Sequence, residues 1–326
     1  MTGDRARDSR VRTVFLGSGS FGVESLTRLA SHDDVDLVGV VTAQPRPAGR
    51  SQQLTGTPIY DHAGAAGVRS ILTPARLRAP ESIAAILGLE PDLLVLADYG
   101  QIVPAELLDV RHGALNLHPS LLPRHRGATP IPAAILAADA ETGVTLMRMD
   151  PGLDTGPIID LVRVSLDGNE TASDLEPRLA DLGAALLSER LGPWLAGEIT
   201  PQPQDDGAAT LTRPFRREDG RLDPTRPTSE LERQVRALQP WPGTFVEAPS
   251  GRIKVFVAEV LPPAADQHPS TFVPDDGDGL ALATIDGRLR LVEVQSAGGR
   301  RMTGSDFRRG LNGPKGLLRA LAGRLP

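Results

Sequence analysis

Cysteine is absent from the 326 residues, and its absence removes several kinds of chemistry. Without thiols the chain can form no disulfide, no thiolate metal site and no cysteine nucleophile, so any covalent mechanism needs another group. The six histidines show no HxxxH or comparable ligand spacing. We therefore expect no bound metal.

Long apolar runs are missing as well. No stretch approaches the ~20 apolar residues that a membrane-spanning helix needs. The first eight residues, Met-Thr-Gly-Asp-Arg-Ala-Arg-Asp, lack the apolar core of a secretion signal. We expect a cytoplasmic protein that does not contact a membrane.

Positive charge is scarce in the first two thirds of the chain. Residues 1–212 hold 17 Lys and Arg against 27 Asp and Glu, whereas residues 213–326 hold 18 against 14. This asymmetry favours an acidic catalytic body followed by a basic module that approaches phosphates, although a merely solvated surface stays open as an alternative. The length also favours two domains.

The segment from Ala114 to Ile159 carries the most chemistry. Ala114 to His118 alternates as a short strand, with Asn116 and His118 on one face, and Pro119 ends it. An amide and an imidazole are thus placed together at a strand end, where open α/β sheets bind ligands.

Two further parts of this segment are loops with special residues. Ser120-Leu121-Leu122-Pro123 is a rigid loop outside any ladder, and Arg124 to Gly127 adds positive charge for gripping a ligand. After a strand at 143–149, glycines and prolines constrain the turn that carries Asp154. Each residue alone is more often structural. Together, an amide and an imidazolium that hold an oxyanion, with a carboxylate that orients the ring and helps to remove a proton, suit acyl transfer.

The rest of residues 1–204 alternates strands with helices, which predicts a doubly wound, mostly parallel α/β sheet. We expect strands at 12–16, 36–42, 68–72 and 92–97, and helices near 23–29, from 57, at 81–87 and at 173–191. Gly17 to Gly22 reads GxGxxG, but the strand after it ends in Thr42-Ala43-Gln44 without the acid that holds a dinucleotide ribose. We interpret these glycines as a tight turn. Residues 43–56 form a long loop without periodicity.

Residues 205–212 are expected to be a linker, and 213–326 a second domain. Ser229 to Glu232 is a capping box before a helix. Alternating segments at 253–260, 280–285 and 289–294 predict a small β-barrel.

Asn116, His118 and Asp154, with Ser-Leu-Leu-Pro between them, resemble the signature of the 10-formyltetrahydrofolate-dependent formyltransferases. The runs from Ser120 to Ile131 and from Met149 to Gly156 look like the branch of that family that acts on methionyl-tRNA. Trp241-Pro-Gly resembles its second-domain marker. The resemblance covers about Thr13 to about Gly310.

This resemblance implies an enzyme that moves the formyl group of 10-formyltetrahydrofolate to the α-amine of methionyl initiator tRNA, with Asn116, His118 and Asp154 as catalytic residues. It implies a barrel of the oligonucleotide-binding type and a monomer. The implied folate contacts are Ser120, Leu121, Leu122, Pro123, Asp98, Tyr99 and Gly100. The implied RNA contacts are Arg46, Arg50, Arg300 and Arg301, with Arg308 and Arg309 beside them. Asp98, Gln52 and Gln53 depart from the family pattern.

Three rival functions remain. A sugar-nucleotide or glycinamide-ribonucleotide N-formyltransferase would use the same first domain but would not need the Pro-Ala-Gly-Arg loop or the Trp-Pro-Gly barrel. A noncatalytic RNA-binding module would not need all three of Asn116, His118 and Asp154. A nucleotide-linked oxidoreductase is disfavoured by the missing ribose acid.

Overall fold

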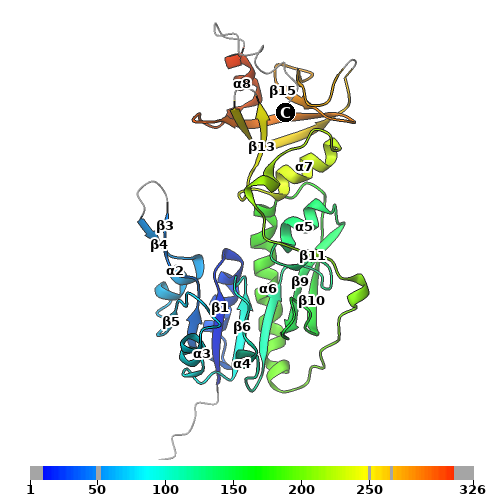
Figure 1. Cartoon of the computed structure of the whole chain (residues 1–326). Helices are drawn as coiled ribbons and strands as arrows, with labels where there is room; N and C mark the ends of the chain where they lie inside the picture. Colours follow the sequence, from blue (N-terminus) through cyan, green and yellow to red (C-terminus); the bar gives the residue numbers. More distant parts are fainter. Residues whose placement is uncertain (1–9, 49–52, 249–250, 265–266, 312–326) are drawn as a thin grey trace, which may run out of the picture. The chain divides into compact units, whose positions relative to one another are not determined.

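The computed structural model describes residues 10–48, 53–248, 251–264 and 267–311, which fall into two compact units (Figure 1). Unit 1 lies within Met1–Pro130, Glu141–Ser165 and Glu176–Thr212, and unit 2 within Ile131–Ala140, Leu166–Leu175 and Arg213–Pro326. Unit 2 thus takes in two short segments that interrupt unit 1 in the sequence. No helix among the described residues combines the length and the apolar character needed to cross a membrane.

Unit 1 is built on a seven-stranded sheet with the strand order β10-β9-β7-β6-β1-β2-β5. Its strands are β1 (Val11–Gly17), β2 (Val35–Val41), β5 (Ile71–Leu72), β6 (Leu93–Ala97), β7 (Ala114–His118), β9 (Glu141–Arg148) and β10 (Ile158–Ser165). The neighbouring strands in the part β5-β2-β1-β6-β7 of the sheet run parallel to one another. Strand β9 pairs antiparallel with β7, and β10 pairs antiparallel with β9, so these two strands form an antiparallel edge. The expected mostly parallel sheet is confirmed, and β10 is an addition to the expected strands.

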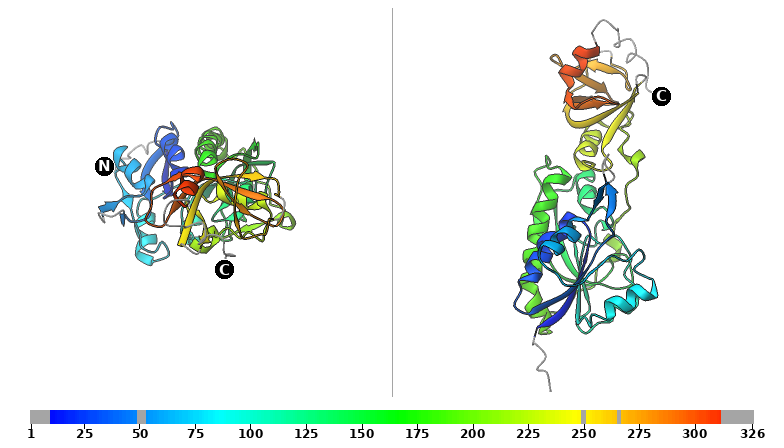
Figure 2. Two further views of the ribbon diagram at one scale, coloured as in Figure 1. Left: turned by 90° about the horizontal axis from the view of Figure 1, so that it is seen from above. Right: turned by 90° about the vertical axis from the view of Figure 1, so that its left-hand side faces the viewer.

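The helices of unit 1 pack against this sheet. They are α1 (Val23–Ala30), α2 (Pro58–Ala65), α3 (Pro80–Leu87), α4 (Ala105–Leu108) and most of α6 (Ala172–Leu195). Buried Val14 and Leu94 of the sheet share one core cluster with Ile86 of α3 and Leu107 of α4. Figure 2 shows α6 running along one side of the sheet. This packing buries the apolar residues on which the strand predictions depended.

Local sequence signals account for several of these elements. The run 93–97 is fully buried as β6, as expected of a central parallel strand. At the start of α2, the side chain of Thr57 accepts a hydrogen bond from the backbone N–H of Tyr60 (3.0 Å), and Pro58 occupies the first turn. The predicted cap and proline are therefore confirmed.

The glycines at 17–22 form the tight turn that we expected, including a short 3-10 helix, η1 (Ser20–Gly22). A Cβ atom on Gly17 would lie 2.7 Å from the carbonyl oxygen of Ala97, so a side chain does not fit there. After β2, the Thr42 hydroxyl bonds that of Thr57 at 2.7 Å. The position at which a dinucleotide site needs a carboxylate is thus filled by a buried threonine.

Unit 2 is an antiparallel sheet with the order β12-β13-β16-β15-β14, and a short β17 pairs with β16. The strands are β12 (Thr244–Ala248), β13 (Gly251–Leu261), β14 (Phe272–Pro274), β15 (Leu280–Ala283), β16 (Arg288–Ser296) and β17 (Met302–Thr303). Its helices are α5 (Pro130–Leu136), which begins at the last residue of a unit 1 segment, α7 (Thr228–Ala237), α8 (Gly304–Leu311) and a 3-10 turn, η3 (Arg217–Gly220). The expected small β-barrel is confirmed as an antiparallel sheet curled into a half-barrel (Figure 1).

The capping box predicted at Ser229 is wrong. Helix α7 begins one residue earlier, at Thr228, and its N-cap Pro227 has no side-chain hydrogen bond. The Thr228 backbone N–H instead donates to the carboxylate of Asp286 (2.9 Å), which comes from the turn before β16. A tertiary contact thus replaces the local cap that the sequence pattern suggested.

Two short pairings were not expected. Within the loop at 43–56, β3 (Arg46–Ala48) and β4 (Gln53–Thr55) form an antiparallel pair. The second pair is parallel and joins β8 (Arg126–Gly127) to β11 (Leu211–Thr212), which follows the 3-10 turn η2 (Asp206–Ala208). Residues 205–212, assigned above to a linker, therefore pack with unit 1.

Candidate active site

Strand β7 presents Asn116 and His118 on the same face, two residues apart. Leu115 and Leu117, on the opposite face, are fully buried. The His118 residue is 4% exposed. Asn116 is half-buried, and its carboxamide makes no hydrogen bond to any residue that the structure describes. An amide donor is therefore available beside a fixed imidazole.

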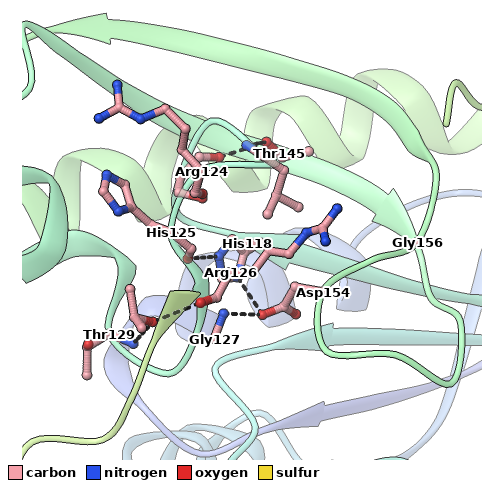
Figure 3. Close-up of polar contacts among 12 residues, drawn as sticks. His118, Arg124, His125, Arg126, Gly127, Thr129, Thr145, Asp154 and Gly156 are labelled. Atoms are coloured by element: carbon pink, nitrogen blue, oxygen red, sulfur yellow. Dashed lines mark hydrogen bonds and ion pairs between the residues drawn. The ribbon is translucent and has the colours of Figure 1, made fainter. Parts of the chain in front are cut away.

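The ring of His118 is held between two loops (Figure 3). Its Nε2 donates to the carbonyl oxygen of His125 at 2.9 Å, since a carbonyl can only accept. Its Nδ1 lies 3.6 Å from Oδ2 of Asp154. The same Oδ2 accepts a hydrogen bond from the backbone N–H of Gly127 (2.7 Å). The structure thus brings Asp154 to His118, and one loop, 125–127, contacts both of them.

Three residues of this region adopt left-handed backbone conformations that side chains other than glycine rarely take. They are Asp98 (φ 54°), His125 (φ 58°) and Asp154 (φ 53°). Such conformations cost free energy and persist only where the surroundings fix them. Their concentration around His118 agrees with a site that is held in one geometry.

Gly127 is required by close approach of the backbone. Its φ is 106°, and a Cβ atom would lie 2.4 Å from the carbonyl oxygen of Thr212 in β11. A side chain here would separate β8 from β11 and move the N–H that bonds Asp154.

The expected folate loop Ser120–Pro123 is tied down from β9. The Thr145 hydroxyl donates to the carbonyl of Ser120 (2.7 Å) and accepts from the N–H of Leu122 (3.1 Å). The Ser120 hydroxyl, fully buried, donates to the carbonyl of Arg124 (2.7 Å). Within the described chain, the N–H of Leu121 and the carbonyl of Leu122 remain without a hydrogen bond.

Asp98, Tyr99 and Gly100 follow the carboxyl end of β6. The Asp98 carbonyl accepts from the N–H of Ser18 (2.9 Å), which joins this turn to the glycine turn. Partial desolvation, and then repulsion from Glu176, raise the pKa of Asp98 above its usual range, although solvent still reaches the residue. Burial raises the pKa of Tyr99 to about 12. Gly100 is open, since a Cβ atom there would meet nothing within 4 Å.

Gln204 contacts the site but was not among the predicted residues, and Arg126 was predicted only as part of a positively charged loop. Arg126 is buried and bonds Oε1 of Gln204 (2.8 Å) and the carboxylate of Asp206 (2.7 Å). The positive charge that the sequence places at position 126 is thus paired with the carboxylate of Asp206. No spacing in the sequence links position 126 to position 204, so no local signal identifies this contact.

The predicted RNA contacts fall into two groups. The side chains of Arg46 and Arg300 are exposed and make no hydrogen bond or ion pair within the described ranges. Arg301 pairs with Glu293 (2.7 Å) and lies over the ring of Phe256 at 4.3 Å. Arg308 bonds two backbone carbonyls, and Arg309 pairs with Asp306 and Asp278. Arg50 and Gln52 lie outside the described residues.

No group of three or more metal-ligating side chains gathers in the part of the chain that the structure describes. The polar groups at the site are instead an amide, an imidazole, a carboxylate and backbone amides. Amide and cationic donors of this kind stabilise an oxyanion, and a carboxylate can take up a proton.

The fold and these groups agree with comparisons to protein families. A formyl transferase family model matches residues 11–191, and a model of the formyl transferase C-terminal domain matches residues 214–312. The chain therefore belongs to the formyl transferase family.

Its curated relatives narrow the class to methionyl-tRNA formyltransferases. The methionyl-tRNA formyltransferase of Roseiflexus sp. (strain RS-1) is 43% identical over 303 residues, which cover 92% of this chain and 93% of that protein. That of Myxococcus xanthus (strain DK1622) is 41% identical over 303 residues, or 93% of this chain and 96% of that protein. The similarity thus runs through both units.

Solved structures share the fold at low sequence identity. HypX from Aquifex aeolicus, in complex with tetrahydrofolic acid, has a TM-score of 0.63 and 16% identity, and it matches 94% of this chain, which spans about half (48%) of that protein. The sugar 3N-formyl transferase WlaRD, solved in the presence of dTDP and 5-N-formyl-THF, has a TM-score of 0.61 and 18% identity, with 86% and 96% coverage. At these identities the likeness concerns the fold.

Proposed function

We propose that the protein transfers the formyl group of 10-formyltetrahydrofolate to the α-amine of methionyl initiator tRNA. The observation that carries this proposal is the uncommitted carboxamide of Asn116 beside the His118–Asp154 pair. The site lies at the carboxyl end of β7, where open α/β sheets bind ligands. Relatives named methionyl-tRNA formyltransferase, similar over nearly the whole chain, supply the acceptor.

The reaction needs an oxyanion site and a proton acceptor. The amine nitrogen attacks the formyl carbon, a C–N bond forms, and the carbonyl oxygen takes the electron pair. When this oxyanion collapses, the bond to N10 of the folate breaks. The attacking nitrogen loses a proton and the folate nitrogen gains one, which leaves the N-formyl product and tetrahydrofolate.

We assign one role to each of the three side chains. The N–H of the Asn116 carboxamide donates to the oxyanion. Nε2 of His118 donates to a carbonyl and Nδ1 faces the carboxylate of Asp154, so a ring with a hydrogen on each nitrogen would place positive charge beside the oxyanion. Asp154 orients this ring and assists removal of the amine proton, directly or through a water.

The folate is proposed to bind beside these groups. Leu121 offers a backbone N–H and Leu122 a carbonyl, neither with a partner among the described residues, and Gly100 leaves open space at the end of β6. Ser120, Pro123, Asp98 and Tyr99 complete the proposed contacts. All of these residues lie in unit 1, so one chain suffices for the chemistry, and we propose that the enzyme works as a monomer in the cytoplasm, where charged tRNA is made.

One assay tests the proposed function. The protein is incubated with 10-formyltetrahydrofolate and, in separate reactions, with methionyl initiator tRNA, methionyl elongator tRNA and an amino-sugar nucleotide. We expect rapid formylation of the initiator tRNA and little product in the other two reactions. Product on the amino-sugar nucleotide alone would replace the proposal with a sugar-nucleotide N-formyltransferase.

Removal of single arginines tests the proposed RNA surface of unit 2. Arg300→Ala is expected to lower the slope of log affinity for tRNA against log salt concentration by about one, because one phosphate contact is lost. Arg301→Ala is the matched control and is expected to change the slope less, since Glu293 already compensates the charge of Arg301. Binding is measured at several salt concentrations. An unchanged slope in Arg300→Ala would place the RNA contacts elsewhere, with Arg46 and Arg50 the remaining candidates of the four.

A further inference from the structure

Residues 204–212 are bonded along their length to the loop that carries the partners of His118. The backbone N–H of His125 donates to the Thr210 hydroxyl (2.8 Å), and the N–H of Arg126 donates to the Thr210 carbonyl (2.9 Å). The Thr212 hydroxyl donates to the Arg126 carbonyl (3.1 Å). The positions of the His125 carbonyl and the Gly127 N–H therefore depend on a segment far away in sequence.

Gln204 connects this loop to the one that carries Asp154. Its Nε2 donates to the carbonyls of Asp154 (2.9 Å) and Gly156 (2.7 Å). Its Oε1 accepts from Nε and Nη2 of Arg126 (3.0 and 2.8 Å). The NH2 group and the oxygen of this carboxamide thus each make two hydrogen bonds within the protein. This one side chain joins both loops that hold His118.

We propose that Gln204 is a positioning residue for formyl transfer, and that Arg126, itself fixed by Asp206, holds Gln204 in place. The inference rests on the proposed function, because it assigns the backbone of Asp154 a required position in that reaction.

The conformation of Asp154 explains why the hydrogen bonds from Gln204 affect the position of its carboxylate. Asp154 has a left-handed backbone conformation, and its Oδ2 lies 3.6 Å from the imidazole, just beyond a direct hydrogen bond. Without the two bonds from Gln204, the loop is expected to relax toward an unstrained conformation and to carry the carboxylate away from His118. A displacement of about 1 Å costs about 10²-fold in rate.

The first test compares Gln204→Leu with Gln202→Leu. The side chain of Gln202 is exposed and, among the residues that the structure describes, bonds only the nearby carbonyl of Thr200, so it is a matched control. We expect kcat of Gln204→Leu to fall about 10- to 100-fold while KM for either substrate changes less than about threefold. Gln202→Leu should keep the wild-type kcat. Wild-type kcat in Gln204→Leu would overturn the proposal.

Gln204→Glu separates the two ends of the carboxamide. A glutamate still accepts the hydrogen bonds of Arg126 but has no N–H for the carbonyls of Asp154 and Gly156. We expect a kcat as low as that of Gln204→Leu, with a melting temperature close to wild type. A glutamate variant with full activity would show that the contact to the Asp154 loop is not needed, which would also overturn the proposal.

A double-mutant cycle distinguishes positioning from general destabilisation. If Gln204 acts through Asp154, then Gln204→Leu should lower kcat very little in an Asp154→Asn background, because the group that it positions has already been disabled. Losses that multiply in the double variant would indicate an independent structural effect and contradict the proposal. Failure of the proposed function is seen separately, as the absence of formyl transfer by the wild-type protein.

Discussion

Replacing Asn116 with alanine is expected to lower kcat for formyl transfer by about 10²–10³, the usual cost of removing one oxyanion donor. The carboxamide has no hydrogen bond to the described protein, so its removal breaks no structural contact, and the strand is held by its neighbours β6 and β9. Because the donor acts on charge that develops during the reaction, KM should change little. Single-turnover and steady-state rates measure the effect, with circular dichroism as the check on folding.

Asn169→Ala is the matched control for this variant. Asn169 is exposed, and its side chain likewise makes no hydrogen bond within the described ranges. It should retain the wild-type kcat. If Asn116→Ala also turned over at the wild-type rate, another donor would have to stabilise the oxyanion. The backbone N–H of Leu121, which bonds no other described residue, would be the next candidate.

The part of the site that sequence predicts well is the part with local signals. Apolar alternation through Ala114–His118 and the proline that follows determine both the strand and the face shared by Asn116 and His118, and the structure agrees at each position. The buried run of β6 and the Thr57-Pro58 start of α2 are equally local. In these segments, propensity, pattern and tertiary packing all favour the same structure.

Contacts between distant segments are predicted less well. The glycines and prolines around Asp154 indicate a constrained turn, but they do not show that Gly127 donates to the carboxylate or that Gln204 holds the backbone behind it. Residues 205–212 have a linker-like composition, yet their backbone pairs with β8. Hydrogen bonds of this kind depend on where the sheet places each loop, and no periodicity in the sequence records them.

Ion pairs between distant residues are likewise not predicted from the sequence. Arg301 and Arg309 look like exposed cations in the sequence, but Glu293 and Asp278 from other strands and turns pair with them. The excess of Arg and Lys in residues 213–326 therefore overstates the charge that unit 2 has free for phosphates. Arg300 is a better candidate because its side chain makes no ion pair within the described ranges and interacts with the carboxylate of Asp306 only at longer range.

Replacing Asp154 with asparagine is expected to lower kcat by about 10²–10⁴, the range found for groups that assist proton transfer. Asparagine has nearly the same shape and tolerates the left-handed conformation of this residue, and its side-chain oxygen can still accept from the N–H of Gly127. The substitution therefore removes the negative charge beside His118 while the loop keeps its path. Initial rates at saturating concentrations of both substrates measure the loss.

Asp150→Asn provides the matched control in the same loop. The carboxylate of Asp150 accepts hydrogen bonds from the N–H of Gly152 and the hydroxyl of Thr155, both of which an asparagine oxygen can still accept, and no ion pair joins it to His118. It should leave kcat within about threefold of wild type, since no charge at the reacting atoms is lost. If Asp154→Asn were as active as Asp150→Asn, the carboxylate would have no part in proton removal. Asn116 and the imidazole would then have to stabilise the transition state without it.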